Sequence, residues 1–428
     1  MQDKHFVPFT KEMKKQGYTI LVPNMLGTHF KLAEKVVRSH GYNVEVLDTS
    51  GPQVIETGLR YTHNDACYPA MFVVGQFMDA LNSGKYDPHK TALMMYQTGG
   101  GCRASNYISI IRKALKKAGM EYIPVISFSL GVEKHPGFKV TVPLIYELLY
   151  AIFYGDLIMS LANEVRPCEI NIGDADRLTE RLTQELGDEL GAGKNIRHSQ
   201  IRKNYRMIVQ EFAAIPIVKR DAVKVGVVGE IFVKYSALAN NHLQRFLEKE
   251  GAEVIMPGLM DFLCYCMFNA CEDRGLFGSN AYLYPIYKML YKFMCRSKDE
   301  ISKIITENSD FRGWTPFPEI AGMAEGYIST GVKMGEGWLL TAEMVELSSI
   351  GCKNIVCAQP FGCLPNHICG KGMMQRLNEK NPDVNIVAID YDASASRVNQ
   401  ENRLKLMLFN ANRVFKSVVH NDNDDMVA

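Results

Sequence analysis

The sequence lacks an excess of charge of either sign. Its 428 residues include 48 Lys and Arg against 47 Asp and Glu, so a broad basic face of the kind that binds nucleic acid is not indicated. It also lacks targeting and membrane segments, because residues 1–20 are polar and charged and no stretch reaches the roughly 18 uncharged apolar residues of a membrane span. We therefore expect a cytoplasmic protein that binds neither nucleic acid nor membrane.

The two common nucleotide-binding fingerprints are also missing. The chain has no G-x-x-x-x-G-K-[ST] phosphate loop, and "GVVGEI" (226–231) does not match G-x-G-x-x-G. Any ATP chemistry is therefore expected outside this chain, either in a partner protein or in another part of a longer polypeptide.

The cysteine pattern excludes two further classes of site. The chain has 11 cysteines but no C-x-x-C, whereas structural zinc sites favour paired C-x₂₋₄-C knuckles. An odd number of cysteines with irregular spacing also fits no disulfide scaffold, and thiols stay reduced inside the cell. The cysteines are therefore interpreted either as buried small side chains or as ligands in metal or redox chemistry. A zinc-stabilised scaffold and a single cysteine nucleophile remain the less favoured alternatives.

Apolar runs that read as strands alternate with segments of helical periodicity, first over 18–129 and again over 223–392. This rhythm predicts right-handed βαβ units. The expected fold class is α/β, with two Rossmann-like lobes built on doubly wound, mainly parallel sheets, a helical connector and an interlobe cleft. The predicted boundaries are 1–142 for the first lobe, 143–222 for the connector, 223–412 for the second lobe and 413–428 for a polar tail.

Four cysteines lie where predicted strands end or helices begin. Cys67 precedes a helix that Pro69 can begin, and Cys102 follows a strand and three glycines. Cys357 ends another strand, and Cys363 follows in the same loop. Because ligands of open parallel sheets gather at the carboxyl ends of the strands, these four are predicted to be ligands of a shared group.

The glycine run before Cys102 supports the same interpretation. Gly99, Gly100 and Gly101 allow the backbone to approach a bulky group closely, and backbone N–H groups can bond to cluster sulfides. Arg103 is available to offset the negative charge of an iron–sulfur centre. These four residues are the predicted cofactor-binding loop.

The other cysteines carry weaker signals. Cys295, Cys168 and Cys352 are most simply core residues, since cysteine is among the most buried residue types. Cys264 and Cys271 lie seven residues apart on one helical face, and Cys266 points elsewhere, so their roles stay open. Two acidic residues of the segment 333–344, Glu336 and Glu343, are interpreted as structural.

Longer segments of the chain resemble a known family. The motifs that carry the resemblance are "GLRYTHNDACYPAMFVVGQFMDAL", "QTGGGCRASNY", "PVISFSLGVEKHPGFK", "VGVVGEIFVKYSALANNH", "CAQPFGCLPNHICGKGM" and "AIDYDASASRVNQENRLKLML". Together they resemble the C-terminal region of the large acyl-CoA dehydratase activase-related proteins. That region is itself similar to the D-component of 2-hydroxyacyl-CoA dehydratases and to the double-cubane cluster proteins.

The resemblance, which runs over about 15–410, implies a cytoplasmic protein of anaerobes with an oxygen-sensitive iron–sulfur cluster between two lobes. It implies a homodimer and a separate ATPase activase or reductase that supplies low-potential electrons, so that ATP acts only through the partner. The expected function is that of a reductase component acting on small molecules or on an acyl-CoA system. Two alternatives stay open: a subunit of a 2-hydroxyacyl-CoA dehydratase that works through a ketyl radical, and a non-catalytic module that docks the activase.

The resemblance also implies a ligand set. Carried over by motif, it comprises Cys67, Cys102, Cys357 and Cys363, followed by Cys266, with Cys369 as the nearest candidate for a sixth ligand and Cys264 or Cys271 as alternatives. Six ligands would suit a double-cubane [8Fe-9S] cluster, and a smaller set would suit a single [4Fe-4S] cubane.

Overall fold

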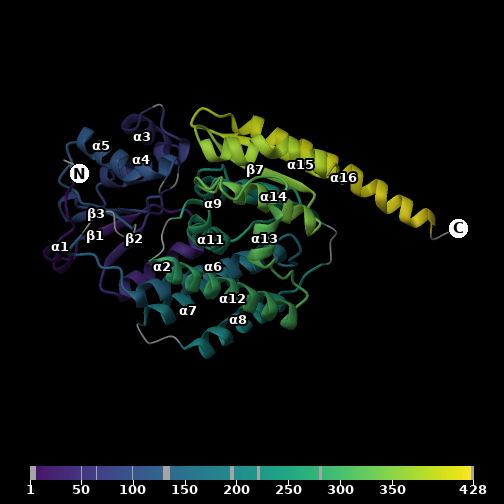
Figure 1. The fold of residues 1–428 in the computed structure, drawn as a ribbon, viewed down its shortest axis with the longest axis horizontal. Coiled ribbons are helices and arrows are strands. Elements are labelled where there is room, and N and C mark those ends of the chain that lie inside the picture. Colours follow the sequence, from purple (N-terminus) through teal and green to yellow (C-terminus); the bar gives the residue numbers. More distant parts are fainter. Residues whose placement is uncertain are drawn as a thin grey trace.

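The computed structural model describes residues 6–49, 51–63, 65–98, 100–128, 135–192, 197–218, 222–278 and 282–425, with side chains to residue 411. It confirms a mixed α/β chain with two four-stranded sheets, in which every described strand pair is parallel (Figure 1). This architecture is consistent with two Rossmann-like units.

The first sheet has the strand order β2-β1-β3-β4. Its strands are β1 (Thr19–Val22), β2 (Asn43–Val46), β3 (Thr91–Met95) and β4 (Val125–Ser127). β3 is buried at four of its five positions, as a strand covered on both faces by helices should be. The chain adds β2 on one side of β1 and then reverses to add β3 and β4 on the other side. The loops that follow β1 and β3 therefore diverge and leave room at the carboxyl edge of the sheet.

The second sheet repeats this plan with the order β6-β5-β7-β8. Its strands are β5 (Val223–Gly229), β6 (Ala252–Ile255), β7 (Asn354–Pro360) and β8 (Asn385–Tyr391). The reversal of direction here lies between β5 and β7. In each sheet, the loops at this point of reversal are therefore expected to contact a ligand.

Helices of the first unit connect its strands. They are α1 (Lys11–Lys15), α2 (Gly27–Ser39), α3 (Gln53–Tyr61), α4 (Tyr68–Asn82) and α5 (Tyr107–Lys117), with short 3₁₀ turns η1 (Pro88–Lys90) and η2 (Arg103–Asn106). α4 has 13 buried residues along its 15 positions, which makes it a core element rather than a surface helix.

The predicted connector forms three helices, α6 (Val142–Val165), α7 (Asp174–Gly191) and α8 (His198–Ala213). In the described part of the chain, α6 is the one helix long and apolar enough to cross a membrane by length and composition, a property that the sequence reading did not assign to it. However, 61% of its most apolar window is buried inside the protein. It packs against α2, α7 and α8 and against β6, as a core helix does.

The second unit contains most of the remaining helices. They are α9 (Ile231–Tyr235), α10 (Leu243–Lys249), α11 (Leu259–Phe277), α12 (Tyr284–Asn308), α13 (Phe317–Met323), α14 (Trp338–Ser349) and α15 (Met374–Lys380), with a π turn η3 (Asn366–Gly370) and a 3₁₀ turn η4 (Lys371–Met373). α11 and α12 pack against one another in one of the more extensive helix pairs of the fold.

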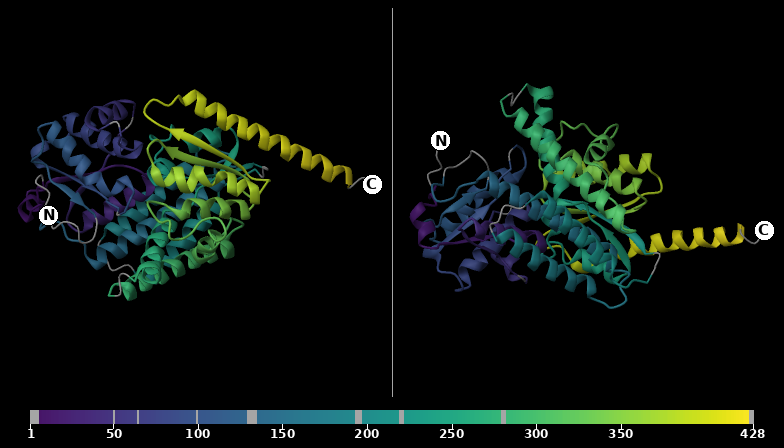
Figure 2. Two further views of the ribbon diagram at one scale, coloured as in Figure 1. Left: turned by 45° about the horizontal axis from the view of Figure 1, so that its top comes forward. Right: turned by 90° about the horizontal axis from the view of Figure 1, so that it is seen from below.

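The last helix, α16 (Arg397–Asp425), extends away from the body of the protein in both views of Figure 2. Its backbone continues through most of the segment 413–428, which the sequence reading treated as a frayed polar tail. The helix contains neither Gly nor Pro over its length, so nothing in its backbone chemistry ends it earlier.

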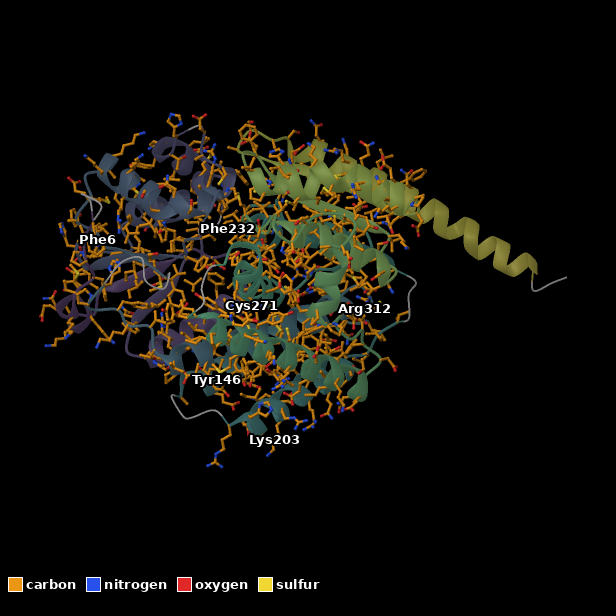
Figure 3. The ribbon with its side chains drawn as sticks, viewed as in Figure 1. Phe6, Tyr146, Lys203, Phe232, Cys271 and Arg312 are labelled. Atoms are coloured by element: carbon orange, nitrogen blue, oxygen red, sulfur yellow. The ribbon has the colours of Figure 1, made fainter. Side chains whose placement is uncertain are left out.

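Two apolar cores each contain residues from both units. Phe72 of α4 and Phe232 of α9 lie with ring centroids 5.6 Å apart, and Figure 3 shows Phe232 where the first unit meets the second. A backbone hydrogen bond of 3.0 Å from Tyr68 N–H to the carbonyl of Phe361 joins the start of α4 to the loop after β7. This contact fixes the strand ends of one sheet relative to those of the other.

A buried carboxylate joins three more segments. Asp156 of α6 is 2% exposed; its Oδ1 lies 2.8 Å from His29 Nε2 of α2 and also accepts the N–H of Leu259. Its Oδ2 accepts the N–H of Met260, so Asp156 acts as the N-terminal cap of α11 from another helix. A side chain at Gly258 would lie only 2.6 Å from Asp156 Oδ2, which explains the glycine before α11.

Replacement of this carboxylate is expected to destabilise the fold. Asp156→Ala leaves the His29 ring and two amide N–H groups buried without a partner, which should lower the free energy of unfolding by about 3 kcal/mol. Urea unfolding measures the loss, with the exposed Asp188→Ala as the control. A loss equal to that of the control would contradict the capping role.

Candidate metal centre

Two cysteines of the first unit lie at the carboxyl end of its sheet. Cys67 precedes α4 with extended backbone angles, and its Sγ lies 3.6 Å from Tyr107 Oη at the start of α5. Cys102 follows β3 and precedes η2, and its carbonyl accepts bonds from the N–H and the hydroxyl of Ser105. Cys102 lies after a strand, as predicted, and Cys67 lies between α3 and α4, just before a helix, as predicted.

Cys363 and Cys369 approach from the second unit. Cys363 follows β7 and is 6% exposed, and Cys369 lies in the π turn η3 with its carbonyl bonded to Thr341 Oγ1 at 2.7 Å. At Gly362, with φ of +73°, a side chain would lie 3.2 Å from the Cα of Cys67. The loop after β7 is therefore in contact with the start of α4, which brings Cys363 next to Cys67.

Two buried carboxylates lie among these thiols. Glu230 follows β5 and bonds to the N–H of Val233, and Glu336 precedes α14 and accepts the N–H of Ile231 at 2.8 Å. Glu336 lies close enough to raise the pKa of Cys102, Cys266, Cys363 and Cys369 by electrostatic repulsion, and Glu230 does the same for Cys67, Cys102 and Cys363. We call this group of five cysteines and two glutamates the thiol cluster.

Glycines allow the loops around the thiol cluster to come close together. At Gly335, with φ of +58°, a side chain would lie 3.0 Å from Pro365 Cγ and 3.5 Å from Cys102 Sγ. Gly101 packs against Met334, next to the same loop. The segment before α14 is thus held between the glycine loop of the first unit and the cysteine loop of the second.

The predicted cofactor loop is described in part. Gly100 has φ of +77°, a conformation that favours glycine, while Gly99 lies outside the described residues. Arg103 donates from Nη1 to the carbonyl of Asp65, and its positive charge offsets a small part of the rise that burial causes in the pKa of Cys67. Its guanidinium therefore lies beside the thiol cluster.

Burial raises the pKa of the cluster thiols well above the ordinary range. Burial is the largest cause and repulsion from Glu336 adds to it, which brings the pKa of Cys102 and of Cys369 to about 11 and that of Cys266 to about 12. Without a cation, these groups remain protonated thiols at neutral pH. Binding of a metal as thiolates must therefore release protons.

The glutamates are shifted in the same direction. Burial and repulsion from Glu336 raise the pKa of Glu230 to about 8, and burial raises the pKa of Glu336. The two carboxyl groups and five thiols are not matched by an equal number of cations. Their neutral, protonated forms are therefore favoured.

The side chain of Cys357 lies against the turn η3, where a side chain at Gly370 would be 3.1 Å from its Sγ. It is fully buried in the apolar core between β7 and α14, with Val228, Met344 and Leu347. Its Sγ lies 3.4 Å from Asn366 Oδ1. Because successive side chains of a strand point to opposite faces, Val356 and Ala358 face the core shared with the first unit while Cys357 faces away from it.

The alternative sixth ligands are also separated from the cluster. Cys264 is fully buried in the core of α11 and α12, where its thiol shares a hydrogen bond with the thiol of Cys295. The pKa of Cys271 is raised by burial and by Glu272 rather than by the cluster acids. Glu336 raises the pKa of Cys369, as it does for Cys102, Cys266 and Cys363, and it is not among the groups that raise the pKa of Cys264 or Cys271.

Sequence reasoning missed two features of this site. Glu230 was passed over as the end of a strand, although it follows β5 just as Cys102 follows β3 and Cys363 follows β7. Glu336 was interpreted as structural, although its carboxylate lies among four thiols. The strand-end rule would have found Glu230, but the position of Glu336 depends on a loop fold that no local pattern specifies.

Within the described ranges, no three His, Cys, Asp or Glu side chains converge on one point as they would around a single metal ion. Two buried polar atoms near the cysteine loops have no hydrogen-bond partner among the described residues: Thr98 Oγ1 and Gln359 Oε1. Such atoms require a ligand or ordered water.

A scan against protein-family models finds no match, and a search of curated proteins finds no similar chain. The site must therefore be interpreted from its own chemistry.

Thiol reactivity tests the pKa shifts directly. In reduced, metal-free protein, Cys102 and Cys369 are expected to hold about 100-fold less thiolate near pH 8 than an ordinary thiol, since their pKa is about 11 rather than 9.0. Alkylation followed by peptide mass spectrometry should show rates that rise with pH up to about 11. A plateau near pH 9 at both residues would contradict the burial described above.

Proposed function

We propose that the protein is an iron–sulfur electron-transfer component with its cluster bound in a cleft between two Rossmann-like lobes. The observation that carries the proposal is the meeting of cysteines from both units around the same two buried acids. A single mononuclear site would need ligands that converge on one point, whereas a polynuclear group would be held by thiols spread around it. The cytoplasm, where thiols remain reduced, is the proposed location.

Five side chains are proposed as the cluster ligands: Cys67, Cys102, Cys266, Cys363 and Cys369. Cys357, which the sequence motif favoured, is left out because its side chain lies in the core on the other face of β7. Such a cluster, either [4Fe-4S] or double-cubane [8Fe-9S], would store and deliver single electrons at low potential. Gly100, Gly101 and Arg103 would contribute close backbone approach and one positive charge.

The chemistry of the surrounding residues suits a low-potential centre. Burial disfavours added negative charge, so the buried surroundings of Cys67, Cys363 and Cys369 would keep a bound cluster hard to reduce. Each 100 mV of one-electron potential corresponds to about 2.3 kcal/mol. An ATP-hydrolysing activase or reductase partner is the proposed source of that energy, and the chain itself is proposed to act as a homodimer.

Anaerobic metal analysis tests this function. The purified chain is expected to contain about four or more irons and a similar amount of sulfide, and the reduced protein should give a low-temperature spin-resonance signal. Fewer than about three irons per chain, or zinc in their place, would overturn the proposal and favour a zinc-stabilised scaffold.

Cysteine variants test the ligand set. Cys102→Ala and Cys363→Ala are expected to lose at least about half of the iron, because each removes a thiolate ligand. Cys357→Ala should retain the iron, and Cys352→Ala, another buried cysteine outside the cluster, is the matched control. Equal iron loss in Cys357→Ala and Cys102→Ala would contradict the ligand set.

Two other functions rest on the motif resemblance alone. A 2-hydroxyacyl-CoA dehydratase subunit would dehydrate its substrate when mixed with an activase and ATP, whereas an electron-transfer component would not. A non-catalytic docking module would bind the activase equally well after Cys102→Ala and Cys363→Ala and would have no iron to lose.

A further inference from the structure

A row of buried charged side chains extends from the thiol cluster along α14. Glu343 and Glu346 lie three residues apart on one face of α14, and Glu336 lies just before this helix, close enough to raise the pKa of Glu343. Glu343 is 2% exposed and Glu346 is 8% exposed. Nothing in the proposed cluster ligation uses the last two.

Two buried lysines lie between these acids. Lys234 of α9 is 4% exposed, and its Nζ lies 3.4 Å from Glu343 Oε1. Lys298 of α12 is 3% exposed and forms an ion pair with Asp261 of α11. Acidic and basic side chains therefore alternate from the thiol cluster to Glu346, near the end of α14.

The charges of this row do not balance. The buried acids Glu230, Glu336, Glu343, Asp261 and Glu346 outnumber the two buried lysines of the row, Lys234 and Lys298. Burying three unpaired carboxylates would cost far more than protonating them, so some of the acids carry a proton. Burial raises the pKa of Glu343 and of Glu346 to about 7, which allows both groups to gain and lose protons near neutral pH.

The outer end of the row lies in a cavity of about 90 Å³. Its walls include Asp261, Lys298, Glu346 and Arg312. Arg312, labelled in Figure 3, forms an ion pair with Glu253 and is 25% exposed at its side chain, so the cavity reaches the surface there. A space of this size and polarity holds several waters.

The inner end is Glu336. Its carboxylate accepts the N–H of Ile231 and lies among Cys102, Cys266, Cys363 and Cys369. The row thus connects surface water at Glu346 with the place where an electron would arrive.

We propose that this row is a proton pathway, in which Glu346 takes protons from the cavity and Glu343 passes them, between Lys298 and Lys234, toward Glu336. The inference rests on the proposed electron-transfer function. For each electron that a bound iron–sulfur group would accept, Glu346 would take one proton from solvent at the cavity and the row would pass one proton on to Glu336, so that the added charges of minus one and plus one cancel in the protein interior. No covalent bond other than O–H and N–H bonds is formed or broken.

The groups that face Glu343 define its titration. They are Lys234 and Tyr235 on α9, Asp261 on α11 with its ion-pair partner Lys298 on α12, Glu336 just before α14, Glu346 on α14, and Cys357 on β7. Of these, Lys234 makes the direct contact, and it lowers the pKa that burial has raised. Substitution of Glu343 by Gln removes the proton carrier and keeps the shape of the side chain.

Flash reduction of the iron-loaded protein by a flavin radical, with a pH indicator in unbuffered solution, tests the pathway. Glu343→Gln and Glu346→Gln are expected to slow proton uptake by about tenfold or more, with iron content unchanged. Glu343→Asp should recover part of the rate, and the exposed Glu319→Gln is the matched control. Uptake as fast in both Gln variants as in the wild type, at full iron content, would overturn the pathway.

A second measurement needs no cluster. The infrared difference spectrum of metal-free protein between about pH 6 and about pH 9 is expected to contain a carboxylic acid band that Glu343→Gln removes. A spectrum unchanged by this substitution would show that Glu343 holds no exchangeable proton and would also overturn the pathway. If the wild-type chain contains no iron but the band is present, then the electron-transfer function fails while the proton-carrying row stands.

Discussion

The contact between α4 and the loop after β7 determines the rest of the site. The Phe72–Phe232 ring pair and the bond from Tyr68 N–H to the Phe361 carbonyl hold the carboxyl ends of two separate sheets against one another. Without this contact, Cys67 and Cys363 would belong to two unrelated surfaces. The glycine at 362 permits the close approach, because a side chain there would meet the Cα of Cys67. Apolar burial between the units therefore supplies the free energy that brings the thiols together.

Charge burial is the second physical theme of the structure. Five acids and two lysines lie in and beside the core of the second unit, where each ionised group without a partner would be strongly disfavoured. Natural cores avoid such groups unless a function requires them, so their concentration next to five thiols is informative. Their neutral forms are favoured at rest. A site made of neutral thiols and neutral acids can accept metal and electrons while releasing or moving protons, and thereby keeps its total charge nearly constant.

Much of the fold could be predicted from the sequence because strand and helix periodicities are local signals. The apolar runs at 91–97, 223–231 and 385–392 become β3, β5 and β8, and the restart of the α/β rhythm at 223 coincides with the first strand of the second sheet. The tail was less predictable: its polar composition suggested fraying, yet the lack of Gly and Pro allows α16 to continue.

The candidate site was predictable only where its residues lie at strand ends. Cys67, Cys102 and Cys363 followed from that rule. Cys357 satisfied the same rule, but it is still within β7, where side-chain alternation turns it toward the other core. Glu336 and Lys234 could not be found from local patterns, since their positions depend on how α9 and α14 pack. Long-range packing, and not residue type, decides which side chains of a loop reach the site.

X-ray absorption at the iron edge, on the chain purified without oxygen, tests the central claim most directly. The account predicts an all-sulfur first shell around iron together with scattering between neighbouring irons, because thiolates from both units would enclose one polynuclear core. A first shell of nitrogen and oxygen, or the absence of iron from the anaerobic protein, would contradict it.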